Sequence, residues 1–553
     1  MSKHRVVDHI VDQLAACGVE FVFGVDGANI EDLYDALHFH PGITGVLAKH
    51  EFSAATMADG FSRASSGLGV VAATSGGGSL NLIAGLGESY TSRVPVLALV
   101  GQPPIAMDGR GSFQDTSGLG GSLDAVALFS AVSVYCRRLV EPADVGWALP
   151  EAIAAAREGG PAVLLLPKDE QQSLIGALRP PTIAPFRRVD DPRPVVDVLR
   201  RTHGPVTIIA GEQVARDDAR GQLRSLGRAL GACVATVPDA KDVAKTTLVT
   251  GVMGHPGVEA AIRASAVCLL VGTRLSVTAR AGLDEALAAT RTISIGSTPP
   301  FVPSEHVHSD DLRRTLGDVA EAVKGRRTEK LESLLRSELR PPEHDGAGVR
   351  YRDAMTALDR LMPADADVVV DAGNSGAAAI HHLPVRRFGR FIVALGMGGM
   401  GYSFGAAIGM CFARRRRTVV IAGDGSFFMH GLELHTAVQY RLPITFVLFN
   451  NNAHAMCVTR EQLFYDDRYS YNRFTPSRLG AGLAAMFPGL PSVDVEDAAT
   501  LPGALRDAFA HDGPSVVSVE CSADEIPPFA PFLQSVQRLS TTEEMTHDVA
   551  ARA

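Results

Sequence analysis

The sequence is poor in tryptophan, in paired cysteine motifs and in net positive charge. Only one of the 553 residues is tryptophan, and the seven cysteines are scattered without CxxC or CxxH spacing. That pattern gives no sign of a zinc site or a disulfide framework, and it favours a reducing, cytoplasmic compartment. Lys and Arg number 52 against 61 Asp and Glu, which gives a net charge of −9. Because nucleic-acid-binding proteins normally carry a basic excess, we expect no nucleic-acid partner.

Long hydrophobic runs suited to a membrane are also missing. The most apolar segment, residues 391–413, is 23 residues long and uncharged, but six of its residues are glycine. Each glycine costs a helix roughly 1 kcal/mol relative to alanine. We therefore predict a loop followed by a buried helix at this segment, with no membrane span. The N-terminal residues carry acidic groups where a secretory signal would be apolar, so we expect no such signal.

The length and the alternation of segment types predict three α/β domains. Proline-rich joints at residues 179–185 and 340–344 divide the chain into three parts. In each part, short Val/Ile/Leu runs alternate with alanine-rich helical stretches, which is typical of doubly wound parallel sheets buried on both faces. We predict domains at residues 1–178, 186–338 and 345–553.

The first and third parts repeat one pattern of strand, glycine-rich turn, helix and strand. The distance from the first strand to the proline that precedes the second is 25 residues (70 to 95) in one part and 24 (419 to 443) in the other. Convergence on a common βαβ unit is one explanation. The other is two versions of one domain that face each other across a shared ligand.

The strongest chemical motif lies in the third part. Gly423, Asp424, Gly425 and Ser426 follow an apolar strand and open a helix, where backbone N–H groups can hold a phosphate oxygen. Asn451 ends the next apolar strand, 27 residues after Asp424. Adjacent parallel strands would bring the carboxylate and the amide oxygen to one edge of the sheet. This donor pair suits a divalent cation such as Mg²⁺ that bridges a diphosphate.

With these motifs the sequence resembles the thiamine diphosphate-dependent enzymes, and within them the acetolactate synthase-like group. The third part carries the resemblance most clearly, at residues 396–401, 423–429 and 450–456. The first part matches at residues 49–51, 58–61, 75–81 and 113–114. The middle part matches more loosely, at residues 251–254 and 272–274. The resemblance implies a pyrimidine-binding, a central and a diphosphate-binding domain, in this order.

For the third domain, the resemblance implies a place for the diphosphate and its Mg²⁺. The metal ligands would be the Asp424 carboxylate, the Asn451 side chain and the Ala453 carbonyl. The groups near the phosphates would be Gly423, Gly425, Ser426 and Asn374.

For the cofactor's rings, the resemblance implies a site completed by a second subunit, hence a homodimer or homotetramer. Glu51 would hydrogen-bond the pyrimidine nitrogen, close to Asn81, which matches the family's pyrimidine loop. Met400 would be the apolar wedge that bends the cofactor, and the Gly398 carbonyl would receive the pyrimidine amine. Met456 would line the thiazolium pocket.

The resemblance implies decarboxylation of a 2-oxo acid such as pyruvate. Protonation would then give an aldehyde, whereas attack on a second carbonyl compound would give a carboligase product. Phe113 and Gln114 stand where simple decarboxylases tend to carry a His-His pair, which favours carboligation with Gln114 at the catalytic site. A simple 2-oxo acid decarboxylase and a non-catalytic relative remain the alternatives.

Several positions depart from the acetolactate synthase pattern. Arg460 occupies the place of the tryptophan that selects the second substrate, so it would suit an anionic acceptor or else be a surface cation. His454 and His430 are candidate proton shuttles or structural histidines. In the middle domain, residues 274–280 lack the usual flavin-binding pattern, and no acidic residue follows the strand at 292–295. FAD is therefore doubtful.

Overall fold

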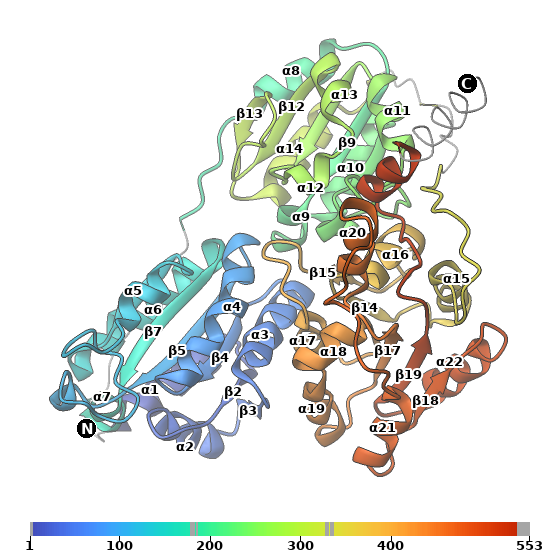
Figure 1. Cartoon of the computed structure of the whole chain (residues 1–553). Helices are drawn as coiled ribbons and strands as arrows, with labels where there is room; N and C mark the ends of the chain where they lie inside the picture. The colour runs from blue at the N-terminus through green and yellow to red at the C-terminus, as the bar shows by residue number, and fades with distance from the viewer. Residues whose placement is uncertain (1–3, 177–182, 184–185, 327–330, 332–336, 539–553) are drawn as a thin grey trace, which may run out of the picture. The chain divides into compact units, whose positions relative to one another are not determined.

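Three parallel β-sheets flanked by helices make up the protein, which confirms the predicted α/β class (Figure 1). The computed structural model describes residues 4–176, 183, 186–326, 331 and 337–538. These residues form two compact units. The first unit comprises the described residues of 1–187, 394–418 and 428–444, and the second those of 188–393, 419–427 and 445–553.

The first sheet has six parallel strands in the order β3-β2-β4-β5-β7-β6. Its strands are β2 (Phe21–Val25), β3 (Thr44–Leu47), β4 (Gly69–Ala73), β5 (Val96–Gln102), β6 (Tyr135–Arg138) and β7 (Pro161–Pro167). Its helices are α1 (Val6–Ala16), α2 (Glu31–Phe39), α3 (Glu51–Ser65), α4 (Gly77–Thr91), α5 (Ala125–Ser130), α6 (Val145–Gly159) and α7 (Lys168–Gln172). The apolar side chains of α1 and α6 pack on one face of this sheet, and α3 lies against β2 and β4. A short antiparallel pair, β1 (His4–Arg5) with β8 (Leu174–Ile175), closes this part of the chain.

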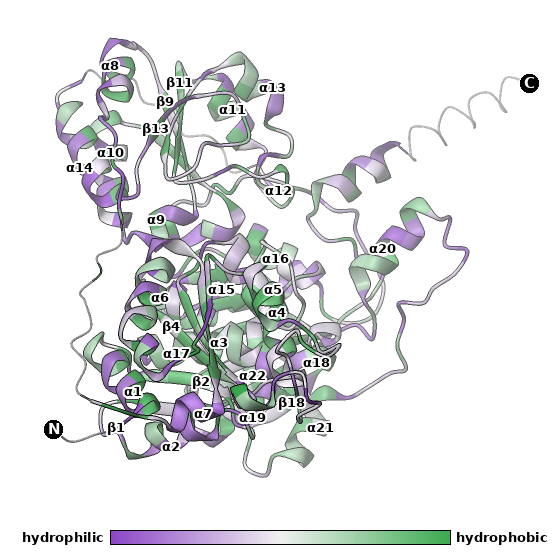
Figure 2. Ribbon diagram, turned by 90° about the vertical axis from the view of Figure 1, so that its left-hand side faces the viewer, coloured by the Kyte–Doolittle hydropathy of each residue, from purple (hydrophilic) through white to green (hydrophobic). Residues whose placement is uncertain are grey.

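The central sheet has five parallel strands in the order β10-β9-β11-β12-β13. Its strands are β9 (Val206–Ala210), β10 (Cys233–Thr236), β11 (Val267–Val271), β12 (Arg291–Gly296) and β13 (Glu305–His308). Its helices are α8 (Arg193–Arg201), α9 (Glu212–Arg216), α10 (Arg220–Leu230), α11 (Gly257–Arg263), α12 (Val277–Arg280), α13 (Asp284–Ala289) and α14 (Leu312–Ala322). Strands β9 and β11 are buried along their whole length, and Figure 2 shows them in the hydrophobic colour, whereas α10 and α14 carry hydrophilic stretches.

The third sheet has six strands in the order β15-β14-β16-β17-β19-β18. Its strands are β14 (Asp367–Val370), β15 (Phe391–Val393), β16 (Thr418–Gly423), β17 (Ile444–Asn450), β18 (Ser492–Val495) and β19 (Ser515–Glu520). The helices of this part are α15 (Tyr351–Leu361), α16 (Asn374–His382), α17 (Tyr402–Arg414), α18 (Asp424–His430), α19 (Leu434–Gln439), α20 (Ala455–Phe464), α21 (Leu479–Met486) and α22 (Leu501–Ala510). The first and third sheets follow the same strand order when their strands are counted from β2 and β14. This shared order favours two versions of one domain over a single recurring βαβ unit.

The charge-free segment at 391–413 is only partly as predicted. It ends in the buried helix α17, as expected, but it begins with a strand, β15, that pairs in parallel with β14. The three residues Phe391–Val393 are too short a run to separate a strand from a loop by periodicity. No helix among the described residues is long and apolar enough to cross a membrane. Most of the proline-rich joint at 179–185 lies outside the described residues.

Candidate active site

Glu51 is the first residue of α3, at the carboxyl end of the first sheet. His50 caps this helix, because its Nδ1 accepts a hydrogen bond from the Phe52 N–H at 3.1 Å. The Glu51 side chain is almost buried, and its Oε2 accepts a hydrogen bond of 2.9 Å from the Asn81 amide. Among the described residues its Oε1 has no hydrogen-bond partner. A Cβ on Gly78 would lie 3.0 Å from Oε1, so glycine at position 78 keeps this oxygen accessible.

Gln114 contacts the glycine-rich turn that precedes α4. Its backbone is in the left-handed region, with φ of 60°. Its Oε1 lies 3.4 Å from the hydroxyls of Thr74 and Ser75, and its Cβ is so close to Gly76 that a Cβ there would meet it at 2.7 Å. Gln114 therefore fixes the turn that leads to Asn81. The neighbouring Phe113 is 74% exposed.

The loop that carries Met400 is held by a buried acid, Glu88, that no motif in the sequence indicates. Glu88 on α4 accepts the backbone N–H groups of Met397 at 2.7 Å and Gly396 at 3.2 Å. The Arg63 guanidinium lies 3.1 Å from the same carboxylate and 2.6 Å from Asp59. Burial opposes ionisation of Glu88, but Arg63 and the two N–H groups together hold its pKa below the ordinary value.

Met400 belongs to the same compact unit as Glu51. Gly399 lies against the ring of Phe52, the residue after Glu51, since a Cβ on Gly399 would be 3.6 Å from that ring. Gly398 and Gly401 both have positive φ, 66° and 87°, which only glycine adopts readily. The structure therefore brings the glycine-rich loop and the start of α3 together, and Met400 itself is half-buried.

Removing the Glu88 carboxylate is expected to destabilise the protein. Glu88→Ala leaves Arg63 and the two loop N–H groups without this partner, and breaking a buried pair costs about 3 kcal/mol. Because the pKa of Glu88 is lowered by folding, this stabilisation is complete at neutral pH and is lost as the pH falls through that lowered pKa. Thermal unfolding at pH 7 measures the loss. The control is Glu305→Ala, whose exposed pair with Arg291 is worth less than about 1 kcal/mol. Equal losses in both variants would contradict this role of Glu88.

His430 lies in this region but is poorly suited to carry a proton near neutral pH. Its ring stacks on Phe52 at 4.2 Å between centroids and contacts His50 at 5.0 Å. Burial, with a contribution from His50, lowers the pKa of His430 to about 4. The neutral ring also fits closely against Gly401, where a Cβ would approach it within 2.7 Å. These contacts favour the structural interpretation of His430.

Asp424 and Asn451 converge at the ends of β16 and β17 in the second unit. Asp424 is 1% exposed, and its two oxygens accept the N–H groups of Gly425 at 2.9 Å and Ala453 at 3.2 Å. The Asn451 Oδ1 accepts the same Ala453 N–H at 3.1 Å, and its Nδ2 donates to the Tyr351 hydroxyl at 3.3 Å. Burial raises the pKa of Asp424 to about 7, although the N–H groups oppose the shift. A cation beside this carboxylate would relieve the cost of burying its charge.

The residues beside this pair fit a metal-bound diphosphate. Asn374 begins α16 and is 4% exposed, yet neither its Oδ1 nor its Nδ2 has a hydrogen-bond partner in the part of the chain that the structure describes. A buried polar group without a partner is rare unless a ligand or water satisfies it. Ser426 donates a hydrogen bond of 2.7 Å to Asp371. The described residues contain no cluster of three or more His, Cys, Asp or Glu that could hold a metal ion, so a cation here would depend on one carboxylate, one amide and a backbone carbonyl.

Helix α16 is anchored at its other end by a buried lysine from the central part. The Lys241 ammonium donates to the carbonyl of Ile380 at 2.6 Å and also to that of Leu383. Its charge lies at the C-terminal end of the helix, where the helix dipole is favourable to a cation. Lys241 thus helps to fix the helix that carries Asn374. The adjacent His381 is buried, and its Nδ1 lies 3.0 Å from the Met253 carbonyl, which supports a structural role for it.

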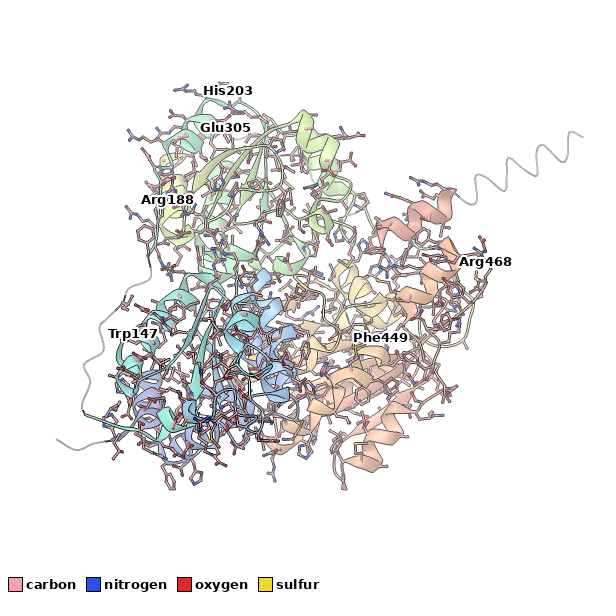
Figure 3. All side chains as sticks on the ribbon, turned by 60° about the vertical axis from the view of Figure 1, so that its left-hand side comes forward. Trp147, Arg188, His203, Glu305, Phe449 and Arg468 are labelled. Atoms are coloured by element: carbon pink, nitrogen blue, oxygen red, sulfur yellow. The ribbon has the colours of Figure 1, made fainter. Side chains whose placement is uncertain are left out.

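Three further candidate residues, His454, Met456 and Arg460, lie on and around α20. His454 precedes the helix, and its ring contacts Phe474 edge to face at 4.8 Å. Met456 is half-buried, whereas Arg460 is exposed and has no ion pair among the described residues. Trp147 lies elsewhere, on α6, with the Arg137 guanidinium 4.6 Å from its ring; Figure 3 labels it together with Phe449 of β17.

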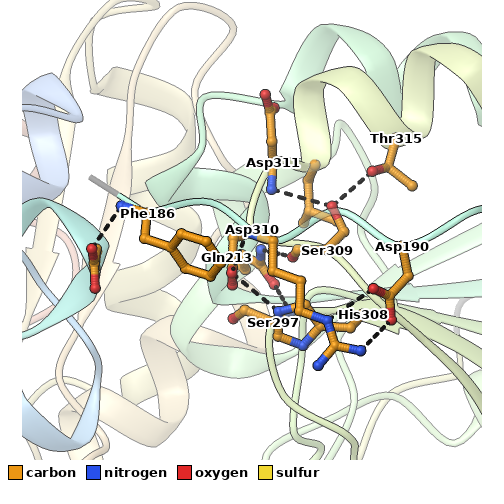
Figure 4. Close-up of polar contacts among 12 residues, drawn as sticks. Phe186, Asp190, Gln213, Ser297, His308, Ser309, Asp310, Asp311 and Thr315 are labelled. Carbon is orange, nitrogen blue, oxygen red and sulfur yellow. Dashed lines mark hydrogen bonds and ion pairs between the residues drawn. The ribbon is translucent and has the colours of Figure 1, made fainter. Parts of the chain in front are cut away.

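The strand ends of the central sheet are occupied by the domain's own side chains. Gln213 on α9 accepts the Ser297 N–H at 2.8 Å and donates to the Ser309 carbonyl at 2.8 Å (Figure 4). A Cβ on Gly296 would lie 3.1 Å from the Gln213 Oε1. Parallel α/β sheets usually bind nucleotides in a crevice at these ends. Here the amide of Gln213 bridges the ends of two strands.

Comparison with known proteins assigns the region around Glu51 and the region around Asp424 to the same protein family. Models of the thiamine pyrophosphate enzymes match three regions: the N-terminal TPP binding domain at residues 4–121, the central domain at 193–324 and the C-terminal TPP binding domain at 371–519. Together these regions cover more than half of the chain. They lie within the three predicted domains, whose boundaries remain predictions.

Relatives of similar length match the chain nearly end to end. The acetolactate synthase isozyme 2 large subunit of Escherichia coli is 29% identical, over 96% of this chain and 99% of its own. The acetolactate synthase large subunit of Lactococcus lactis is 26% identical, over 93% and 92%. The crystal structure of benzoylformate decarboxylase from Polynucleobacter necessarius has the same fold, with a TM-score of 0.79, 21% identity and coverage of 95% and 100%. The chain therefore belongs to the thiamine pyrophosphate enzymes.

Proposed function

We propose that this protein is a thiamine diphosphate- and Mg²⁺-dependent enzyme that decarboxylates a 2-oxo acid and joins the remaining acyl group to a second carbonyl compound, in the manner of an acetolactate synthase. The observation that carries the proposal is the convergence of Asp424 and Asn451 on Ala453, beside the unpartnered amide of Asn374. The similarity to acetolactate synthase large subunits supports the carboligation step.

The second unit would hold the cofactor through its diphosphate. The Asp424 carboxylate, the Asn451 amide oxygen and the Ala453 carbonyl supply three hard oxygen ligands for Mg²⁺. The backbone N–H groups of residues 423–426 and the Asn374 side chain would bind the phosphate oxygens. When bound, thiamine diphosphate supplies a carbon nucleophile for the substrate carbonyl and accommodates the electron pair left as carbon dioxide departs.

Glu51 would exchange a proton with the pyrimidine ring of the cofactor. Asn81 fixes the carboxylate through Oε2, which leaves Oε1 available for that exchange. Gly78 provides the room for a ring beside Oε1. Met400 would support the bent cofactor, Gly398 would offer its carbonyl to the pyrimidine amine, and Met456 would line the thiazolium pocket.

The fate of the acyl group distinguishes the two enzymatic alternatives. Gln114 is engaged with Thr74 and Ser75 and has no acidic proton, so it cannot protonate a product as a histidine could. Arg460 would attract an acceptor that carries an anionic group, and His454 would lie beside it.

The proposal is tested by incubating the protein with pyruvate and a panel of other 2-oxo acids. Carbon dioxide release is measured, and the products are identified by mass spectrometry. We expect the product to be a 2-hydroxy ketone or an acetohydroxy acid. Free aldehyde as the main product would establish the simple decarboxylase. Release of no carbon dioxide from any of the acids would favour the non-catalytic relative.

We also propose that a second subunit completes each site, in a homodimer or homotetramer. Two large apolar side chains of the first unit remain exposed, Met397 at 63% and Phe428 at 54%, as expected of a surface that another chain covers.

Mixed oligomers are expected to recover activity. Chains with Glu51→Gln and chains with Asp424→Asn would each be inactive alone. If Glu51 and Asp424 of one site come from different chains, the purified hybrid dimer should have about half of the wild-type activity, because one of its two sites contains neither substitution. Co-expression with two affinity tags and purification of the hybrid provides the measurement. An inactive hybrid would mean that each site is built from a single chain.

We expect the central domain to support the fold without a flavin. Gln213, Ser297 and Ser309 already satisfy one another at the strand ends. The purified protein, supplied with FAD and desalted, is therefore expected to show no flavin absorbance near 450 nm and unchanged product formation. Retention of about one flavin per chain would contradict this expectation.

A further inference from the structure

A large groove borders the outer strand of the central sheet, on the α10 side of that sheet. Its volume is about 1190 Å³. One wall is formed by α10 and β10, and the other by residues 242–248 and 385–390. All of these segments belong to the second compact unit. The groove is separate from the strand ends that Gln213 bridges.

The groove is lined by an unusual excess of cations. Arg220, Arg224 and Arg228 recur every fourth residue of α10 and therefore share one face of the helix. Lys245 and three arginines at 386, 387 and 390 line the opposite wall, whereas Asp242 is the one carboxylate among the described residues that line the groove. The whole chain has a net charge of −9, so this concentration of positive charge is local. Neighbouring arginines on one helix face repel one another unless an anion lies between them.

The carboxylates near the groove form ion pairs with only some of the arginines and lysines that line it. Asp242 pairs with Arg220 at 3.0 Å and lies 3.7 Å from Arg390, and Asp359 pairs with Arg386. Arg224, Arg228 and Lys245 are exposed and have no ion pair in the described chain. In addition, the Nε of Arg220 is buried and lacks a hydrogen-bond partner among the described residues, whereas its Nη1 lies 4.0 Å from the Asp218 carboxylate. A buried guanidinium donor without an acceptor suits an anionic ligand.

An aromatic side chain stands beside these cations. Phe388 is 56% exposed, and the Arg387 guanidinium lies 4.9 Å from the centre of its ring. Leu223, Val234 and Val385 add apolar surface to the groove. Inorganic anions need no aromatic surface, whereas a nucleotide base stacks on an aromatic ring while its phosphates bind arginine. The volume is also sufficient for a ligand of nucleotide size.

We propose that this groove binds a nucleotide with two or more phosphates, the base against Phe388 and the phosphates between Arg224, Arg228 and Lys245. This inference does not depend on the proposed function, because none of these residues belongs to the thiamine diphosphate site.

Calorimetric titration of the full chain with ATP tests the proposal. The protein is first saturated with thiamine diphosphate and Mg²⁺, and the titration is repeated with Asp424→Asn, so that binding at the cofactor site is recognised. We expect the same ATP binding in both proteins, and weaker binding as the salt concentration rises. The double variant R224E/R228E is expected to weaken binding at least about tenfold, since it reverses two phosphate contacts. The matched control R313E/R314E, on α14 of the same domain, should bind ATP as the wild type does.

Two further probes separate a nucleotide site from a general anion site. Phe388→Ala should weaken ATP binding and leave the binding of inorganic tripolyphosphate unchanged. Should R224E/R228E fail to fold, Lys245→Glu provides a second charge reversal in the same groove. The proposal would be overturned by wild-type protein that does not bind millimolar ATP at 0.15 M salt, by equal losses in R224E/R228E and R313E/R314E, or by tripolyphosphate binding as tightly as ATP.

Discussion

Glu51→Gln is expected to lower the turnover of the 2-oxo acid by about 10² to 10⁴, the usual contribution of a positioned acid or base. Glutamine keeps the shape of the side chain, and its carbonyl oxygen can still accept the 2.9 Å hydrogen bond from Asn81. It cannot take up or release the proton that Oε1 would exchange with the cofactor. The expected loss is therefore in turnover, while the fold and the affinity for thiamine diphosphate change little. Steady-state carbon dioxide release, together with cofactor titration, measures both quantities.

The control for this variant is Glu321→Gln, which changes an exposed glutamate on α14 of the central domain. It should retain wild-type turnover. An active Glu51→Gln enzyme would show that another group performs the proton exchange. A variant that loses cofactor affinity as strongly as turnover would instead make Glu51 a binding residue.

Asp424→Asn is expected to abolish metal-dependent binding of thiamine diphosphate. In the wild type, a ligand at a hundred times its dissociation constant stabilises the folded state by about 2.7 kcal/mol, which appears as a rise in Tm. Asparagine removes the one carboxylate of the proposed ligand set, so this rise should disappear. The apo protein should remain folded, because the substitution replaces a buried charge with a neutral amide of similar shape.

Thermal unfolding with and without the cofactor, Mg²⁺ and a chelator provides this measurement. The control is Asp365→Asn, an exposed position in the same domain, which should show the full metal-dependent rise. If Asp424→Asn retained that rise, the cation would have to bind elsewhere.

Much of the fold and the centre of the site could be predicted from sequence because both depend on local patterns. Continuous apolar runs predicted the buried strands, and the strand ends predicted that Asp424 and Asn451 would meet. Both oxygens do reach the Ala453 N–H. Strand β15 was missed, because three residues carry no periodicity and β15 is set by its pairing with β14.

Contacts between distant segments could not be predicted in the same way. Glu88 holds Met397 across a separation of 309 residues, and no spacing in the sequence indicates it. The basic groove likewise joins α10 to residues 385–390, which are far apart in the chain. The arginines at 220, 224 and 228 are visible as a helical stripe, but a charged stripe alone is typical of an ordinary solvated face. The arginine stripe becomes part of a candidate ligand site because the opposite wall and Phe388 lie across the groove from it.

We propose that a metal-held diphosphate on Asp424 and Asn451 places the attached ring beside the Glu51 of a neighbouring subunit. A crystal structure of the protein grown with thiamine diphosphate and magnesium tests it most directly. We expect a cation bound by Asp424, Asn451 and the Ala453 carbonyl, with the Glu51 Oε1 of a neighbouring subunit in hydrogen-bond contact with the aminopyrimidine. Crystals in which the cofactor is absent from this site, or bound far from every Glu51 in the assembly, would contradict it.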